Sequence, residues 1–105
     1  MKIIFCKEAD KISDYEVEDF FQAHKNAGDD DEIKISSFLL LYRFRVAVRT
    51  GEIEPFQFDV IDFDGEVYAA ECDETGRLDD QTMRSVYRAK VLNLEEEYLN
   101  TLIGI

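Results

Sequence analysis

The chain has 105 residues, 46% of them hydrophobic, and a formal net charge of −12. The length suits a single domain over residues 1–105, because two halves would be too small to bury separate cores. The apolar content argues against a disordered chain, and no apolar run approaches the roughly 18 residues that cross a bilayer. The charge opposes direct contact with nucleic acid or with an anionic membrane.

The cysteine content and the N-terminal residues bear on the cellular compartment. Two cysteines, Cys6 and Cys72, are too few for a disulfide framework or a four-ligand zinc site. Both lie in segments that resemble buried strands, where a reduced thiol packs as a small hydrophobe, and a disulfide or redox pair is the less favoured alternative. Met1 leads directly into Lys2, Ile3 and Ile4, without the apolar region and cleavage site of a signal peptide. We therefore expect a cytoplasmic protein.

The first elements in chain order are a strand over residues 2–7 and a helix over residues 13–27. The strand is short and apolar on both faces, which is typical of an inner strand. At the start of the helix, Ser13 and Glu16 have the spacing of a capping box, and apolar residues follow at helical intervals.

Residues 33–51 carry conflicting signals. Over residues 42–49 large apolar side chains alternate with arginine or alanine, as in a half-buried strand. Ser36 or Ser37 can instead cap a helix that three leucines favour and that Gly51 can close. We favour a helix over residues 37–50, and a strand over 42–49 is the alternative.

The second half of the chain predicts a hairpin and a long helix. The hairpin covers residues 56–73, because Asp64-Gly65 suits a two-residue turn between two apolar runs, which would place Ile61 opposite Tyr68. The helix covers residues 80–103, capped by Asp79 or Asp80, and a second capping box at Asn93 could divide it.

Together these elements predict an α+β fold. A small antiparallel sheet, made of the strand at 2–7 and the hairpin at 56–73, packs against two or three helices. If residues 42–49 formed a strand, it would be the fourth of the sheet.

Catalytic, cofactor and metal motifs are missing from the sequence. His24 is the only histidine, and its place on a helix favours packing or hydrogen bonding over catalysis. No phosphate-binding loop, nucleophile elbow or dinucleotide fingerprint is present. The acidic clusters do not match the twelve-residue calcium loop. We therefore expect a protein that is not an enzyme and binds neither a cofactor nor a metal.

The acidity is segmental. Residues 33–51 carry four basic and no acidic groups, whereas residues 52–80 carry eleven acidic groups and only Arg77. Arg43, Arg45 and Arg49 are few for nucleic-acid binding, so we expect them to pair with the acid-rich hairpin. On the predicted register, carboxylates gather at both ends of the hairpin, roughly 20 Å apart at about 3.3 Å per residue.

Carboxylates at fixed spacings can stand in for phosphates and engage a basic protein surface. The expected partner-binding residues are Glu52, Glu54, Asp59, Asp62, Asp64, Glu66, Glu71, Asp73 and Glu74. Apolar anchors beside them would be Phe56, Phe63, Tyr68 and Tyr98, where these are exposed.

The sequence thus suggests an acidic protein that binds the basic surface of another protein, such as a nuclease or a nucleic-acid-binding protein. Such a protein would be a nucleic-acid-mimicking inhibitor of a defence system or an immunity protein for a nuclease toxin. The alternative is a structural or assembly module, homo-oligomeric in one form, whose acidity only keeps it in solution.

Overall fold

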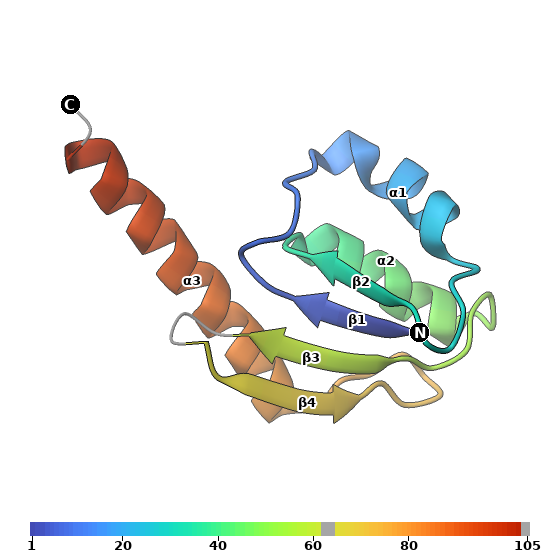
Figure 1. Cartoon of the computed structure of the whole chain (residues 1–105). Helices are drawn as coiled ribbons and strands as arrows, with labels where there is room; N and C mark the ends of the chain where they lie inside the picture. Colours follow the sequence, from blue (N-terminus) through green and yellow to red (C-terminus); the bar gives the residue numbers. More distant parts are fainter. Residues whose placement is uncertain (62–64, 104–105) are drawn as a thin grey trace.

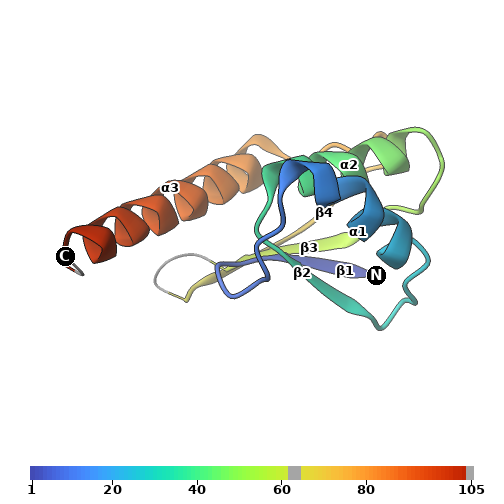
Figure 2. The same ribbon diagram turned by 90° about the horizontal axis from the view of Figure 1, so that it is seen from above.

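The computed structural model describes residues 1–61 and 65–103 and confirms the α+β class (Figure 1). A four-stranded sheet is covered on one face by helices (Figure 2). The strands are β1 (Lys2–Phe5), β2 (Glu32–Ile35), β3 (Gln57–Ile61) and β4 (Val67–Glu71). The helices are α1 (Val17–His24), α2 (Phe38–Arg49) and α3 (Asp80–Ile103). A short 3₁₀ turn, η1 (Asp14–Glu16), precedes α1.

The sheet is mixed, so the expectation of an antiparallel sheet is wrong for the first strand. The strand order is β2-β1-β3-β4, with β1 parallel to both β2 and β3 and only β3 and β4 antiparallel. The reason is the unpredicted strand β2. A helix lies on each connection between β1, β2 and β3 and returns the chain to the same end of the sheet, which makes these strands parallel.

The two helical crossovers have opposite hands. The chain steps from β1 to β2 in one direction along the sheet and then passes back over β1 to β3. Helices α1 and α2 nevertheless cover the same face (Figure 2). They also contact each other, with the rings of Phe21 and Phe44 5.1 Å apart. Opposite steps over one face require opposite hands, so one crossover departs from the usual right-handed connection.

Residues 38–49 form a helix, so the helix predicted over 37–50 is confirmed and the strand over 42–49 is wrong. The Ser37 hydroxyl accepts a hydrogen bond from the Leu40 backbone N–H at 3.2 Å. At the other end Gly51 has a φ of 78°, which lets the chain leave the helix. The alternation of apolar residues over 42–49 does not correspond to one buried face. Phe44 and Val48 lie on the buried face of the helix, whereas Val46 is exposed on the other.

The hairpin forms between the expected segments, but its register differs by one residue from the predicted one. Val67 and not Tyr68 lies opposite Ile61, and Tyr68 lies opposite Val60. The two-residue turn predicted at Asp64-Gly65 includes Asp64, which lies outside the described residues.

The main core lies between the sheet and the helices. Phe21, Phe44, Phe56 and Phe58 are almost fully buried and pack edge to face in succession. Phe56 is therefore a core residue and cannot anchor a partner. The predicted burial of the thiols is confirmed, because Cys6 and Cys72 are buried and not bonded to each other, and burial raises the pKa of each.

Helix α3 is continuous from Asp80 to Ile103, without a break at Asn93. Its first turns pack through Val86 and Ala89 against β3 and β4. At 1.5 Å per residue the helix is about 36 Å long, and its later part projects beyond the sheet (Figures 1 and 2). Among the described residues, no helix combines the length and the apolar character that crossing a bilayer demands.

Candidate functional site

Four of the nine predicted carboxylates gather at one end of the sheet. Glu54 precedes β3, Glu71 is the last residue of β4, and Asp73 and Glu74 follow it. Because β4 runs opposite to the other strands, its last residue lies beside the first residues of the parallel strands, as the pairing of Gln57 with Glu71 shows. The predicted hairpin register places these four residues, together with Glu52, at one end of the hairpin, and the fold adds other carboxylates to the four.

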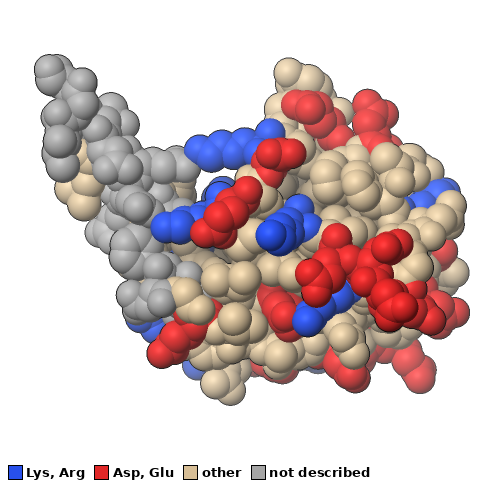
Figure 3. All heavy atoms as spheres, viewed as in Figure 1, with Lys and Arg blue, Asp and Glu red and all other residues tan. Residues whose placement is uncertain are grey.

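The additional carboxylates are Asp29, Asp30, Asp31 and Glu32, which lead into β2. The Lys2 backbone N–H donates to the Asp31 carbonyl at 3.0 Å, and the Gln57 N–H donates to the Met1 carbonyl at 3.2 Å. These bonds hold the starts of the three parallel strands together. Figure 3 shows acidic side chains gathered most densely at this end of the sheet, on the right of the view.

We call this surface the acidic end. All its carboxylate residues are exposed. They are Asp29, Asp30, Asp31, Glu32, Glu54, Glu71, Asp73, Glu74, Asp79 and Asp80. Within the described ranges none of them forms an ion pair at 4.0 Å or less. Three cations lie close by: the N-terminal ammonium, which donates to the Asp29 carbonyl at 3.4 Å, Lys2, and Arg77, which lies beside Asp73.

Glu71 is the centre of this surface. It helps to line a hollow of about 340 Å³ that also includes Met1, Asp29 and Gln57. A second hollow, of about 450 Å³, extends from Glu71 to Asp79 and Asp80, and a third adjoins Lys2. The surface of the acidic end therefore contains several shallow hollows, and Glu71 lines each of them.

Two carboxylates of the acidic end also hold the backbone that carries them. Asp73 accepts hydrogen bonds from the Thr75 hydroxyl at 2.7 Å and from the Arg77 backbone N–H at 3.0 Å, which lower its pKa. Asp79 accepts from the Thr82 N–H at 2.7 Å as the cap of α3, which lowers its pKa too. Both therefore stay ionised at neutral pH in a fixed geometry.

The other predicted site residues lie elsewhere. Asp59 projects from the open face of β3 and pairs with Lys2 at 3.0 Å, which raises the pKa of Lys2. Glu66 lies just before β4, at the opposite end of the sheet, and accepts from the Tyr68 hydroxyl at 3.0 Å. Asp62 and Asp64 lie outside the described residues, as does the suggested anchor Phe63.

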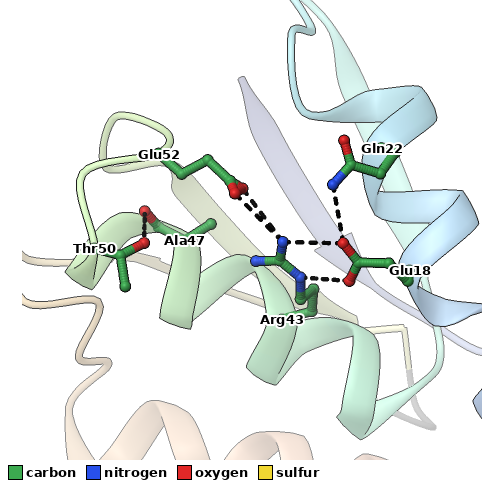
Figure 4. A network of polar contacts seen from close by, with 6 residues as sticks. All are labelled: Glu18, Gln22, Arg43, Ala47, Thr50 and Glu52. Carbon is green, nitrogen blue, oxygen red and sulfur yellow. Dashed lines mark hydrogen bonds and ion pairs between the residues drawn. The ribbon is translucent and has the colours of Figure 1, made fainter.

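Glu52 belongs to a network that joins α1 to α2 (Figure 4). The Arg43 guanidinium donates to both carboxylate oxygens of Glu18, at 2.7 and 3.1 Å, and to Glu52 at 3.3 Å. Hydrogen bonds from Arg43 and Gln22 lower the pKa of Glu18 to about 2. Arg43 also covers the Phe21 ring at 3.8 Å from its centroid.

The expected pairing of the α2 arginines with the hairpin is wrong. Arg43 pairs with Glu18 of α1 and with Glu52, three residues beyond the end of α2. Arg45 donates to the Gly76 carbonyl at 2.9 Å, which fixes the loop before α3. In the described parts of the chain Arg49 makes no ion pair.

His24 has the packing and hydrogen bonding that its position on a helix suggested. Its Nδ1 lies 2.7 Å from the Phe20 carbonyl oxygen, and its ring stacks on that of Phe20 at 4.1 Å. Residues 1–61 and 65–103 contain no group of three or more His, Cys, Asp or Glu side chains arranged to hold a metal ion.

Comparison with known proteins gives no relative of this chain. No family model matches it, and no curated protein sequence or solved structure shows significant similarity to it.

Proposed function

We propose that the protein is a non-enzymatic binding protein whose acidic end occupies a basic surface on another protein. One observation carries this proposal: exposed carboxylates from four separate segments, at residues 29–32, 54, 71–74 and 79–80, converge on one end of a rigid sheet. Long-range strand pairing positions them, so their arrangement is a property of the folded molecule.

The spacing of these segments suits a basic, nucleic-acid-binding surface. Adjacent strands lie about 4.8 Å apart, so carboxylates between β2 and β4 cover roughly 14 Å. Along each strand of a DNA duplex, phosphates recur with a rise of about 3.4 Å, so this width matches several phosphates. A nuclease or another nucleic-acid-binding protein is the class of partner that this charge pattern fits, and the cytoplasm is the compartment that goes with it.

The experiment compares two triple variants with the same loss of charge. Glu54→Gln, Glu71→Gln and Glu74→Gln together neutralise the acidic end, and Glu8→Gln, Asp10→Asn and Asp19→Asn together neutralise exposed acids elsewhere. Binding to a panel of basic nucleases is measured by calorimetry at low and high salt. We expect the first variant to weaken binding about tenfold, which is about 1.4 kcal/mol, and the second to change it far less.

Salt provides an independent criterion, because attraction between charged surfaces is screened as the ionic strength rises. We expect affinity for the partner to fall with salt in the wild-type protein and to fall less steeply in the acidic-end variant. Equal effects of the two triple variants, or an affinity that does not change with salt concentration, would mean that the acidic residues serve only to keep the protein in solution.

The alternative function, a structural or assembly module, is favoured by a separate observation on a surface without acidic residues. Exposed apolar side chains lie on α2 and α3, where residues 37–51 and 81–94 contain no acidic group. An assembly contact on that apolar surface is compatible with a partner at the acidic end.

A further inference from the structure

Exposed apolar surface is concentrated on two helices. Seven of the nine large apolar side chains that are exposed among the described residues belong to α2 or α3. On α2 they follow one face, at Leu39, Tyr42 and Val46, and on α3 they are Tyr87, Val91, Leu94 and Leu99. The two helices meet where the rings of Phe38 and Tyr87 lie 5.1 Å apart, so the surface is continuous there.

The apolar stripe on α3 has the spacing of a coiled coil. Tyr87, Val91 and Leu94 are separated by four and then three residues, and position 98 continues the series after four more. This is the alternation of the two core positions in a heptad repeat, in which one helix packs along another. Tyr87 is 49%, Val91 57% and Leu94 53% exposed, although the Tyr87 ring contacts that of Phe38 on α2.

Charge along α3 changes sign halfway. Arg84, Arg88 and Lys90 lie in the first half, and the sequence places three glutamates at positions 95–97 in the second. A helix with a basic first half and an acidic second half is complementary to itself when the second copy runs antiparallel. We infer that α3 pairs with α3 of a second copy, antiparallel and around a twofold axis, to form a homodimer.

The heptad spacing fixes the register. With Val91 opposite Leu94 of the second copy, twofold symmetry places Leu94 opposite Val91 and Tyr87 opposite position 98. The flanking positions then bring Arg88 opposite position 95 and Lys90 opposite position 97, which are glutamates in the sequence. Flanking charge pairs of this kind set the orientation of helices in coiled coils.

The antiparallel arrangement is also the one that the whole-molecule charge favours. A parallel pair would set two bodies of the same strong negative charge side by side, at a repulsive cost. In the antiparallel pair each body lies beside the projecting end of the other copy's α3, and the apolar stripe of α2 extends the contact. An isologous contact of this kind closes on itself and forms a dimer, not a fibre.

The primary test is the mass of the whole protein in solution. Sedimentation equilibrium at high micromolar concentration is expected to give twice the chain mass of 12.2 kDa. Val91→Asp with Leu94→Asp should give a monomer with unchanged circular dichroism, because both side chains are exposed. Val67→Asp, at a 58% exposed apolar residue of β4, is the matched control and should remain dimeric. A monomeric wild type, or a dimer that survives the α3 substitutions, overturns the proposal.

Disulfide trapping tests the orientation. Tyr87→Cys alone should not cross-link two copies, because antiparallel pairing sets the two positions about 16 Å apart along the axis. Tyr87→Cys combined with Tyr98→Cys should cross-link readily. Ready cross-linking of the single variant would show a parallel pair and overturn the register. Arg88→Glu should weaken the dimer, and adding Glu95→Arg should restore it, whereas a lack of rescue counts against the predicted flanking pairs.

Discussion

Arg43 has two acidic partners and an aromatic ring, although it lies in a segment whose own sequence contains no carboxylate. It holds Glu18 of α1 in a two-bond contact and reaches Glu52 beyond the end of α2. The contact ties α1 to α2 at the rim of the core, directly above the buried Phe21. A single guanidinium thus fixes the relative position of two helices, which lysine could not do with the same geometry.

The Glu18 contact makes stability depend on acid pH. The pKa of Glu18 lies near 2 in the folded protein, below its ordinary value of 4.5, so the unfolded chain takes up a proton first as the pH falls. Its stabilising contribution is therefore complete above about pH 5 and disappears towards pH 2. Glu18→Gln should lower the melting temperature at pH 7 and match the wild type near pH 2.

The control is Asp19→Asn, at the exposed neighbouring residue, which should shift the melting temperature less at every pH. Melting curves recorded between pH 2 and 7 measure both variants. A Glu18→Gln deficit that persists unchanged at pH 2 would show that the effect is not electrostatic.

The backbone at Gly76 leaves no room for a residue with a Cβ atom. It has a φ of 77°, and a Cβ atom added there would lie 2.1 Å from the backbone oxygen of Arg45. Gly51 has nearly the same φ of 78° but nothing within 4 Å of the added atom. The pair separates the cost of the dihedral angle from the cost of the clash.

We expect Gly51→Ala to destabilise the protein by about 1 kcal/mol and Gly76→Ala by considerably more, or to prevent folding. Urea unfolding followed by circular dichroism measures both. Similar losses for the two variants would mean that the loop before α3 moves away from Arg45 at little cost.

At the scale of elements, α2 shows which sequence signals decide between helix and strand. The alternation over residues 42–49 and the cap at Ser37 made opposite predictions, and the cap was the reliable signal. A helix with one face against a sheet and part of the other exposed can alternate by chance over eight residues, whereas a cap serves only a helix.

The cap gives a prediction for this element. Ser37→Ala removes the acceptor of the Leu40 N–H and should cost about 1 kcal/mol. Ser36→Ala is the matched control, because in the structure the hydroxyl of Ser37 accepts this bond. The midpoint of urea unfolding should fall for Ser37→Ala and stay close to the wild type for Ser36→Ala. The reverse order would show that Ser36 provides the cap.

Strand β2 shows where prediction from the sequence fails. It has four residues, of which only Ile33 and Ile35 are buried, between an acidic run and two serines. Four residues are too few for a pattern, and the strand forms because β1 offers a free edge of backbone donors and acceptors. Without β2, neither the parallel pairing nor the approach of Asp29–Glu32 to Glu71 could be anticipated.

For the whole molecule, only part of the candidate site could be predicted, because the other part depends on the unpredicted strand β2. Glu71, Asp73 and Glu74 are neighbours in the sequence and Glu54 precedes the same hairpin, so the predicted hairpin brought these four residues together correctly. The residues leading into β2 join them only through strand order. Asp59 and Glu52 were included on sequence proximity alone, and the structure engages both with cations of other elements.

The charge distribution also divides the molecule into two working sides. The acidic end lies where the parallel strands begin, whereas α2 and residues 81–94 of α3 carry basic and apolar side chains and no carboxylate. The proposed partner contact and the proposed dimer contact therefore use different surfaces. The acidic-end variants and the α3 variants should consequently have independent effects.

The position of β1 in the sheet has a consequence for how the chain folds. β1 precedes the other three strands of the sheet in the chain and is paired on both sides, yet its partners lie 30 and 55 residues downstream, at Glu32 and Gln57. Only the β3–β4 hairpin pairs locally, so closing two long loops around β1 is the slow event. Until β1 inserts, the edges of β2 and β3 remain open to pairing with other chains. The strong negative net charge of the chain then opposes such pairing, because incompletely folded molecules repel one another.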